Sequence, residues 1–462
     1  MVMKLENAKL KLPWLEATII LACLFIIIGM GIIHFKMTPH MPILGGVFFL
    51  LLYGRMKGIS FSGMERAMVQ GASSGLGAIY IFFLIGMLIS SWMASGTIPT
   101  IMFYGFDFIS GQAFYAVVFL ITSLIGLCIG SSLTTSATIG VAFIGMAGAL
   151  DLSLAITAGA IISGAFLGDK MSPLSDTTNL ASETVGVPLF EHIKNMLWTT
   201  IPGFVVTFAL FFFLSPQSSG SKVQEIEDMV AALSMYTTIS PWSLLPFILV
   251  GGMALKKVSA IPTLAAGIVS AVVITFIEAP AQTVEEMAKV LYSGFVLDSG
   301  VEQLDIILSR GGIESMYFSI SLVLLALAMG GLLFELGIIP SILHAVQKML
   351  INVGRLVSAT VLTGIGVNFL AGEQYLSVLL PGKAFQDKYG ELGLEGKSLA
   401  RVLEDSGTVV NPLVPWGVCG VFLTQVLGVT TLEYAPFAFF CILCPFLSLV
   451  SGWTKVGLHF KK

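Results

Sequence analysis

The stretch that decides the fold lies in the first half of the chain and reads Gly168-Asp169-Lys170-Met171-Ser172-Pro173-Leu174-Ser175-Asp176-Thr177-Thr178-Asn179. It follows residues 152–167, which carry no charge and predict a helix within a lipid bilayer. Pro173 lacks an N–H group and cannot continue a regular helix. Irregular backbone and ionisable side chains at membrane depth occur inside protein or beside a wet cavity, where they mark a pathway or a binding site. We therefore expect an interrupted membrane helix over 152–187 whose break forms a site.

The composition is that of an all-α polytopic membrane protein. Of the 462 residues, 56% are hydrophobic and only 11% are charged, whereas soluble domains carry about 25% charged residues. The net charge of −4 gives no reason to expect nucleic acid as a partner. The five cysteines lie in apolar runs and the five histidines lack zinc-ligand spacing, so we expect neither a metal cofactor nor redox chemistry.

Apolar segments along the rest of the chain predict further membrane elements. Two apolar pairs, 111–150 and 354–386, predict re-entrant hairpins, and 396–428 predicts a second interrupted helix. The polar, acidic segment 215–238 is predicted to be an external linker. Complete spans are predicted near 14–34, 40–55, 74–95, 194–214, 239–255, 258–277, 315–337 and 434–453.

The two halves of the sequence repeat one another. Residues 96–101 match residues 337–342 at an offset of 241, and Ser172-Pro173-Leu174 matches Asn411-Pro412-Leu413 at an offset of 239. Two matches in order at nearly one offset, with the same order of elements between them, predict an internal repeat. The first repeat covers 1–214 and the second 239–462, with about five spanning helices, one hairpin and one broken helix in each.

The distribution of charge predicts the orientation of the repeats. Basic residues before the first span, after the second, between the spans 239–255 and 258–277, after the span 315–337, and at the end of the chain all fall on one side, which the positive-inside rule places in the cytoplasm. Both termini are then cytoplasmic, and the acidic segments 215–238 and 278–313 are external. The two repeats run in opposite directions through the membrane. Inverted repeats with broken helices at matching positions are typical of secondary transporters with a site near the bilayer midplane.

The two breaks hold the candidate ion ligands. Sodium is a hard cation that prefers oxygen ligands, as calcium and magnesium do. The alternative is an ordinary loop between two helices, and the repeat argues against it. The candidates are Asp169, Ser172, Ser175, Asp176, Thr177, Thr178 and Asn179 in the first break, and Glu404, Asp405, Ser406, Thr408 and Asn411 in the second.

The hairpin tips are a second set of candidates, because helix N-termini there can face an anion or a polar ligand. Any single hydroxyl is more simply explained by a bond to a carbonyl of its own helix. The tip as a whole is predicted to belong to the site. Its residues are Ser132, Thr134, Thr135, Ser136 and Thr138 in the first hairpin, and Asn368, Glu373 and Gln374 in the second.

The motifs favour exchange of sodium for protons. Desolvation disfavours the charged form of a carboxylate, so a carboxylate in a partly dry site can hold either a proton or sodium. We expect Asp176 and Asp405 to be the pair of carboxylates that exchange sodium for protons. We expect Lys170 to neutralise Asp169. Glu404 is expected to support the site without touching the ion.

Three other functions are alternatives to exchange of sodium for protons. A carrier of organic anions would bind their carboxylates at the hairpin tips, aided by Lys383 or Arg401. An intramembrane hydrolase would use Ser73, because residues 71–75 fit the pattern G-x-S-x-G; small residues that open a membrane helix are better explained by close packing. A passive channel would need a pore-lining ring, which the sequence does not display.

Residues 168–179 closely resemble the signature of the NhaC-type sodium/proton antiporters. Residues 404–408, followed by Asn411-Pro412-Leu413-Val414-Pro415-Trp416, resemble the second motif of that family. The resemblance covers most of the chain and implies a carrier of the bacterial cytoplasmic (inner) membrane in the larger ion-transporter superfamily. It also implies inverted repeats, re-entrant hairpins and an elevator-like transport domain, and it leaves a homodimer open.

The resemblance does not decide the substrate. The family also contains sodium-lactate/malate-proton antiporters, which the two motifs do not separate from simple exchangers. Gly417 stands where the second motif has an asparagine, so a polar ligand is not expected at that position. The expected partners are therefore sodium, protons and the lipid bilayer, with malate and lactate as the alternative cargo.

Overall fold

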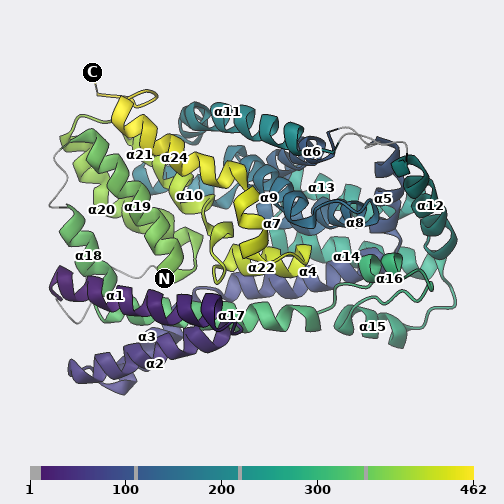
Figure 1. Ribbon diagram of the computed structural model, residues 1–462, viewed down its shortest axis with the longest axis horizontal. Coiled ribbons are helices and arrows are strands. Elements are labelled where there is room, and N and C mark those ends of the chain that lie inside the picture. The colour runs from purple at the N-terminus through teal and green to yellow at the C-terminus, as the bar shows by residue number, and fades with distance from the viewer. Residues whose placement is uncertain (1–11, 109–112, 217–220, 348–351, 462) are drawn as a thin grey trace.

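The computed structural model describes residues 12–108, 113–216, 221–347 and 352–461. The fold is helical throughout these ranges, apart from an isolated β-bridge between Leu394 and Phe460 (Figure 1). Eight helices are long and apolar enough to cross a membrane, or up to eleven if each of three bent helix pairs forms one span. The described chain is therefore an all-α, multi-pass membrane protein.

The helices of the first half follow the predicted order. They are α1 (Trp14–Gly29), α2 (His40–Met56), α3 (Phe61–Ser73), α4 (Leu76–Ala94), α5 (Thr97–Phe108), α6 (Phe114–Ile129), α7 (Ser132–Thr135), α8 (Val141–Ala149), α9 (Leu154–Met171), α10 (Asp176–Val185) and α11 (Leu189–Leu214).

The helices of the second half include three that the sequence did not predict, α12, α15 and α16. They are α12 (Ser221–Tyr236), α13 (Leu245–Leu255), α14 (Ala260–Glu278), α15 (Val284–Ser293), α16 (Glu302–Leu308), α17 (Tyr317–Glu335), α18 (Ile338–Gln347), α19 (Val353–Ala371), α20 (Gln374–Glu391), α21 (Gly396–Leu403), α22 (Val418–Leu427), α23 (Thr431–Tyr434) and α24 (Phe439–Thr454).

Two helical hairpins occupy the positions predicted for them. The first joins α6 to α7 and α8, and a π-helical turn at Ser136–Gly140 connects α7 to α8. The second joins α19 to α20. The chain reverses at Gly130 (φ +70°) and at Gly372 (φ +68°), conformations that only glycine adopts without strain. A Cβ at Gly130 would also lie 2.6 Å from Leu174 Cβ, so the first tip is pressed against the break after α9.

Close packing of α6 on α9 fixes the depth of that break. A Cβ at Gly164 would lie 2.0 Å from Thr122 Oγ1, and a Cβ at Gly168 would lie 2.4 Å from the backbone nitrogen of Leu127. Small residues let membrane helices approach until their backbones touch. This contact brings the end of α9, with Asp169, beside the tip of the first hairpin.

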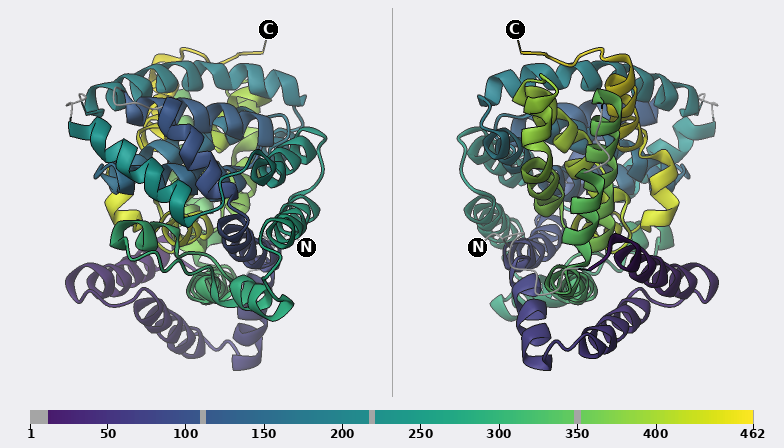
Figure 2. Two further views of the ribbon diagram at one scale, coloured as in Figure 1. Left: turned by 90° about the vertical axis from the view of Figure 1, so that its right-hand side faces the viewer. Right: turned by 90° about the vertical axis from the view of Figure 1, so that its left-hand side faces the viewer.

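The ends of the elongated molecule differ in the elements that they carry (Figures 1 and 2). The helices α12, α15 and α16 lie at one end, whereas α10, α20, α21 and the C-terminal segment lie near the other. Residues 221–236 were expected to be part of a polar loop but form α12, because Met229 and Leu233, on one face of the helix, are buried. A sparse apolar face of this kind is easily missed among acidic residues.

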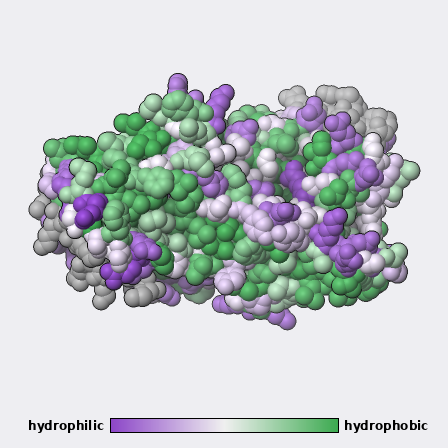
Figure 3. Space-filling view, turned by 90° about the horizontal axis from the view of Figure 1, so that it is seen from below, coloured by the Kyte–Doolittle hydropathy of each residue, from purple (hydrophilic) through white to green (hydrophobic). Residues whose placement is uncertain are grey.

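Hydrophobic side chains cover much of the surface between the two ends (Figure 3). Phe213 on α11 and Ile277 on α14 are 81% and 69% exposed. Contiguous exposed apolar surface on this scale indicates contact with lipid rather than water.

Candidate functional site

The first break is stabilised by side chains of the motif that interrupts the helix. Ser175 caps α10 by accepting the N–H of Thr178 at 3.4 Å. The Thr178 hydroxyl donates to the carbonyl of Lys170 at 3.0 Å, and the Asn179 amide donates to the carbonyls of Ser175 and Pro173 at 2.7 and 3.2 Å. The carbonyls of Lys170 and Pro173, which the break removes from regular helix, are thus hydrogen-bonded within the protein.

The second break begins with a π-helical turn at Glu404–Thr408 and is tied to the second hairpin by two asparagines. The Asn411 amide donates to Asn368 Oδ1 at 2.8 Å, and its own oxygen accepts the N–H of Cys419 at 2.8 Å. The Asn368 amide donates to the carbonyl of Gly407 at 2.7 Å. Because Asn368 is near the end of α19, the hairpin and the broken helix form one hydrogen-bonded unit.

Asp405 is completely buried and forms an ion pair with Lys170, which is also completely buried. Its other oxygen accepts from Ser448 at 2.6 Å, and Thr199 donates to the lysine-bound oxygen at 3.2 Å. Lys170 was expected to neutralise Asp169, the next residue along the chain. That pairing is wrong, because Lys170 points across the protein to Asp405 and to Cys444 Sγ, 3.6 Å away.

Asp169 is held by the tip of the first hairpin instead of by a cation. Its Oδ2 atom accepts the backbone N–H of Ser132 at 3.1 Å, at the start of α7. Unpaired N–H groups and the helix dipole give the beginning of a helix a partial positive charge. A buried carboxylate is stabilised by this arrangement.

Glu404 has one satisfied and one free carboxylate oxygen. Oε1 accepts the Thr177 hydroxyl at 3.0 Å, and Thr177 in turn contacts Ser175 Oγ at 3.1 Å. Oε2 has no hydrogen-bond partner among the described residues, although the side chain is completely buried. The Thr408 hydroxyl, in the same π-helical turn, likewise has no hydrogen-bond partner among the described residues. Two buried oxygens without hydrogen-bond partners therefore belong to one turn of the second break.

Other predicted site residues are located away from these oxygens or bond to their own helix. Asp176 is exposed at the start of α10. Ser406 donates to the carbonyl of Val402 at 2.7 Å. Glu373 caps α20 by accepting the N–H of Leu376 at 2.8 Å, and the Gln374 amide oxygen accepts from the Cys419 thiol at 3.0 Å. Ser172 accepts the N–H of Leu174 at 3.2 Å.

Most hydroxyls of the first hairpin tip form hydrogen bonds to carbonyls of their own helix, which is the simpler explanation given above for a single hydroxyl. Thr135, Ser136 and Thr138 donate to the carbonyls of residues 131, 132 and 134 at 2.8–2.9 Å. The Thr134 hydroxyl accepts from Ser131 at 3.0 Å. The tip contributes to the site through the backbone of Ser132 rather than through these side chains.

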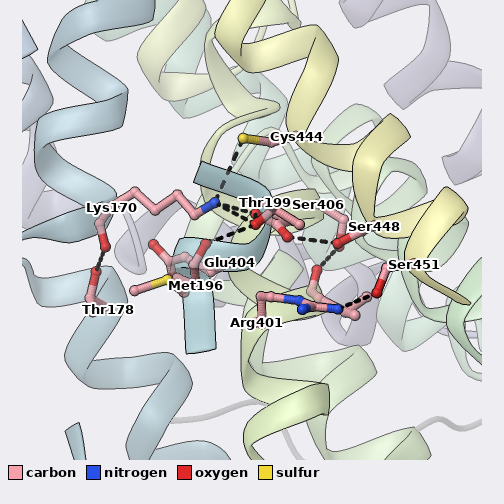
Figure 4. Close-up of polar contacts among 12 residues, drawn as sticks. Lys170, Thr178, Met196, Thr199, Arg401, Glu404, Ser406, Cys444, Ser448 and Ser451 are labelled. Atoms are coloured by element: carbon pink, nitrogen blue, oxygen red, sulfur yellow. Dashed lines mark hydrogen bonds and ion pairs between the residues drawn. The ribbon is translucent and has the colours of Figure 1, made fainter. Parts of the chain in front are cut away.

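Three polar residues around Asp405 were missed by the sequence analysis. Thr199 lies in α11, and Cys444 and Ser448 lie in α24 (Figure 4). None of them is next to a helix break or a charge. The sequence offered only a weak indication of them, a hydroxyl or thiol within a membrane helix. Such a side chain most often forms a hydrogen bond to a backbone carbonyl of its own helix.

The residues that supported the rival functions are engaged elsewhere. Lys383 is exposed. Arg401 is buried and donates to the carbonyl of Gly457 at 2.7 Å and to Ser451 Oγ at 2.6 Å. Ser73 is exposed, and its hydroxyl donates to the carbonyl of Val69 at 2.5 Å. Neither an anion site nor an activated serine is formed by these residues.

The site differs from a protein metal centre. Among the residues that the structure describes, no three His, Cys, Asp or Glu side chains gather as a metal ion would require.

Comparison with known proteins defines the class first. Residues 164–456, which contain both breaks and the second hairpin, match the model of the Na+/H+ antiporter family. The class is therefore that of membrane antiporters, not of enzymes.

Individual relatives extend the match to almost the whole chain. The chain is 42% identical over 441 residues to the Na(+)/H(+) antiporter NhaC of Alkalihalophilus pseudofirmus and 40% identical over 439 residues to NhaC of Bacillus subtilis, covering 95% of each chain in both cases. It is 31% identical to the malate-2H(+)/Na(+)-lactate antiporter of Bacillus subtilis, covering 98% of this chain and 97% of that one. The chain belongs to the Na+/H+ antiporter family, as its two motifs indicated.

Proposed function

We propose that this protein exchanges sodium for protons across the bacterial cytoplasmic membrane by alternating access. The observation that carries the proposal is the pair of buried oxygens without partners, Glu404 Oε2 and Thr408 Oγ1, at a break in a membrane helix. An unsatisfied buried carboxylate oxygen is costly. A proton on Glu404 or a small hard cation bound to it would each relieve this cost, and the two would compete for the Glu404 carboxylate, with the Thr408 hydroxyl available as a further ligand for the cation.

Competition for one site is sufficient to couple the two ions. If the carboxylates hold either sodium or protons, each passage of the site across the membrane carries only one of them. Asp405 and the exposed Asp176 remain in this proposal as the exchanging pair expected from sequence. The geometry adds Glu404 as a direct ligand, because its oxygen is open, whereas Asp405 is already engaged by Lys170.

Sodium that reaches Asp405 must displace the ammonium group of Lys170. Thr199 and Cys444 lie within reach of Lys170 Nζ, and the Phe440 ring centroid is 5.6 Å from it. The thiol and the ring are poor replacements for a carboxylate. We infer that the ammonium group of Lys170 occupies Asp405 when sodium is absent, and that the Lys170–Asp405 pair therefore acts as a gate to the site.

The proposal includes the inverted repeat predicted from sequence. Helical hairpins and broken helices follow one another in the same order in both halves, which supports two repeats at 1–214 and 239–462. The separation of α12, α15 and α16 from the C-terminal end supports the acidic segments and the C-terminus lying on opposite sides of the membrane, and the distribution of basic residues supports both termini being cytoplasmic. A homodimer remains part of the proposal on the strength of the family resemblance alone.

Transport by purified protein in liposomes tests the function. A pH-sensitive dye inside the liposomes reports an imposed proton gradient, and we expect external sodium alone to dissipate it, with potassium much less effective. Protons that move only when malate and lactate are supplied on opposite sides would replace the proposal with the activity named for the Bacillus subtilis relative. If neither condition moves protons, the carrier proposal itself is refuted.

A further inference from the structure

An apolar groove lies on the membrane-facing side of the second hairpin, away from the ion site. Its volume is about 560 Å³, and it is lined by α1, α18, α19 and one residue of α24, Trp453. The lining includes Phe25, Leu362 and Leu370, and its few polar members include Arg355 and Thr363. Volumes in this range are typical of sites that bury a small organic ligand.

The groove is long enough to hold the acyl chain of a lipid in one leaflet. Its α19 lining extends from Arg355 to Leu370, a rise of about 22 Å at 1.5 Å per residue. One leaflet contributes about 15 Å of hydrocarbon to a bilayer. The groove is therefore longer than one leaflet is thick, and it runs from the first turn of α19 almost to the hairpin tip at Gly372.

A positively charged side chain, that of Arg355, lies at one end of the groove. Arg355 is exposed in the first turn of α19, and no described carboxylate pairs with it. Trp453 is 63% exposed beside it and donates its indole N–H to Ser358 at 3.1 Å. Tryptophan is enriched at the depth of lipid headgroups, which places the guanidinium of Arg355 at the level of the phosphates.

We propose that this groove binds an anionic phospholipid, with one acyl chain along α19 and the phosphate against Arg355. Basic pockets between membrane helices on the cytoplasmic side are suited to anionic headgroups, and the charge distribution places this end of α19 in the cytoplasmic leaflet. The lipid lies along the helix that carries Asn368, whose amide holds the carbonyl of Gly407 in the second break. Lipid occupancy therefore stabilises the hairpin that supports the ion site.

The chain offers a variant that fills the groove without disturbing its walls. Gly366 lines the groove, and a Cβ added there would meet no atom within 4 Å. Gly366→Leu therefore removes space for the acyl chain while leaving the packing of α19 intact. Gly252→Leu on α13 is the matched control, because its Cβ also meets open space and it lies outside the groove.

Native mass spectrometry of the full-length protein, titrated with phosphatidylglycerol or phosphatidylcholine, tests the proposal. We expect Gly366→Leu to lose the tight lipid adduct with both lipids, and Gly252→Leu to keep it. Arg355→Gln is expected to keep the adduct but to reduce the preference for phosphatidylglycerol by about fivefold; Arg66→Gln, an exposed arginine on α3, is its control.

Three results would overturn the proposal. The first is equal lipid retention by Gly366→Leu and the wild type. The second is an unchanged headgroup preference in Arg355→Gln. The third is stabilisation of the wild type by inorganic phosphate to the same extent as by phosphatidylglycerol, which would mean that the acyl chain is not part of the ligand. Size-exclusion profiles and circular dichroism of each variant establish that a lost adduct does not reflect a lost fold.

Discussion

Asp405→Asn should destabilise the protein strongly, and a second substitution should reverse the effect. The asparagine keeps an oxygen for the hydroxyls of Ser448 and Thr199 but removes the negative charge that pairs with Lys170. Lys170 is completely buried, and its remaining neighbours include Cys444 and the ring of Phe440. Breaking a buried ion pair by removing one partner costs about 3–5 kcal/mol.

Replacing both charges should cost much less. In Asp405→Asn/Lys170→Met, the methionine places an apolar chain of similar length against the Phe440 ring and the Cys444 thiol. Substituting well-packed apolar groups for a buried pair is neutral or stabilising by about 1–4 kcal/mol. We therefore expect the double variant to recover most of the 3–5 kcal/mol while remaining inactive in sodium–proton exchange, since both groups of the proposed gate are gone.

Equilibrium unfolding of the purified variants, followed by circular dichroism, measures this recovery. The wild type and Lys170→Met complete a double-mutant cycle, which isolates the energy of the pair. The reasoning is refuted if Asp405→Asn unfolds at the same denaturant concentration as the wild type. It is equally refuted if the double variant is less stable than Asp405→Asn.

Further predictions concern the open carboxylate, the helix contact and the orientation. Glu404→Gln should abolish sodium-driven proton movement in liposomes while the protein still inserts and unfolds cooperatively; full activity would remove this residue from the site. Gly168→Ala should lower the free energy of unfolding by about 1–3 kcal/mol, because its Cβ would collide with α6, whereas Gly77→Ala, with open space around it, should have no such effect. Ser299→Cys should react with an impermeant thiol reagent in intact cells and Lys256→Cys should not, and the reverse labelling would invert the proposed orientation.

The fold was largely predictable because membrane helices obey strong local rules. Pro173 and Pro412 interrupt apolar runs, so the two broken helices could be located from sequence. The hairpins were predicted at 111–150 and 354–386, and the structure contains helical hairpins over the described parts of both ranges. The helix at 221–236 was missed, because its acidic residues obscured a narrow apolar face.

The site was predictable in its location but not in its pairings. Lys170 and Asp405 are 235 residues apart, and only the packing of the tertiary structure brings them together. Adjacent opposite charges suggested that Lys170 would serve Asp169, but neighbours on a helix point in different directions. Asp176 shares the motif with Asp169, yet it is exposed because it opens α10 after the break. Sequence alone cannot distinguish these two carboxylates.

Proton release on sodium binding tests the central claim most directly. Sodium is added to the purified protein in a lightly buffered solution near neutral pH, and the change in pH is recorded. If sodium and protons compete for the Glu404 carboxylate, the wild type should release protons in a saturable manner, choline chloride should release none, and Glu404→Gln should release far fewer. Sodium binding that releases no protons, or release that is unchanged in Glu404→Gln, would contradict the account.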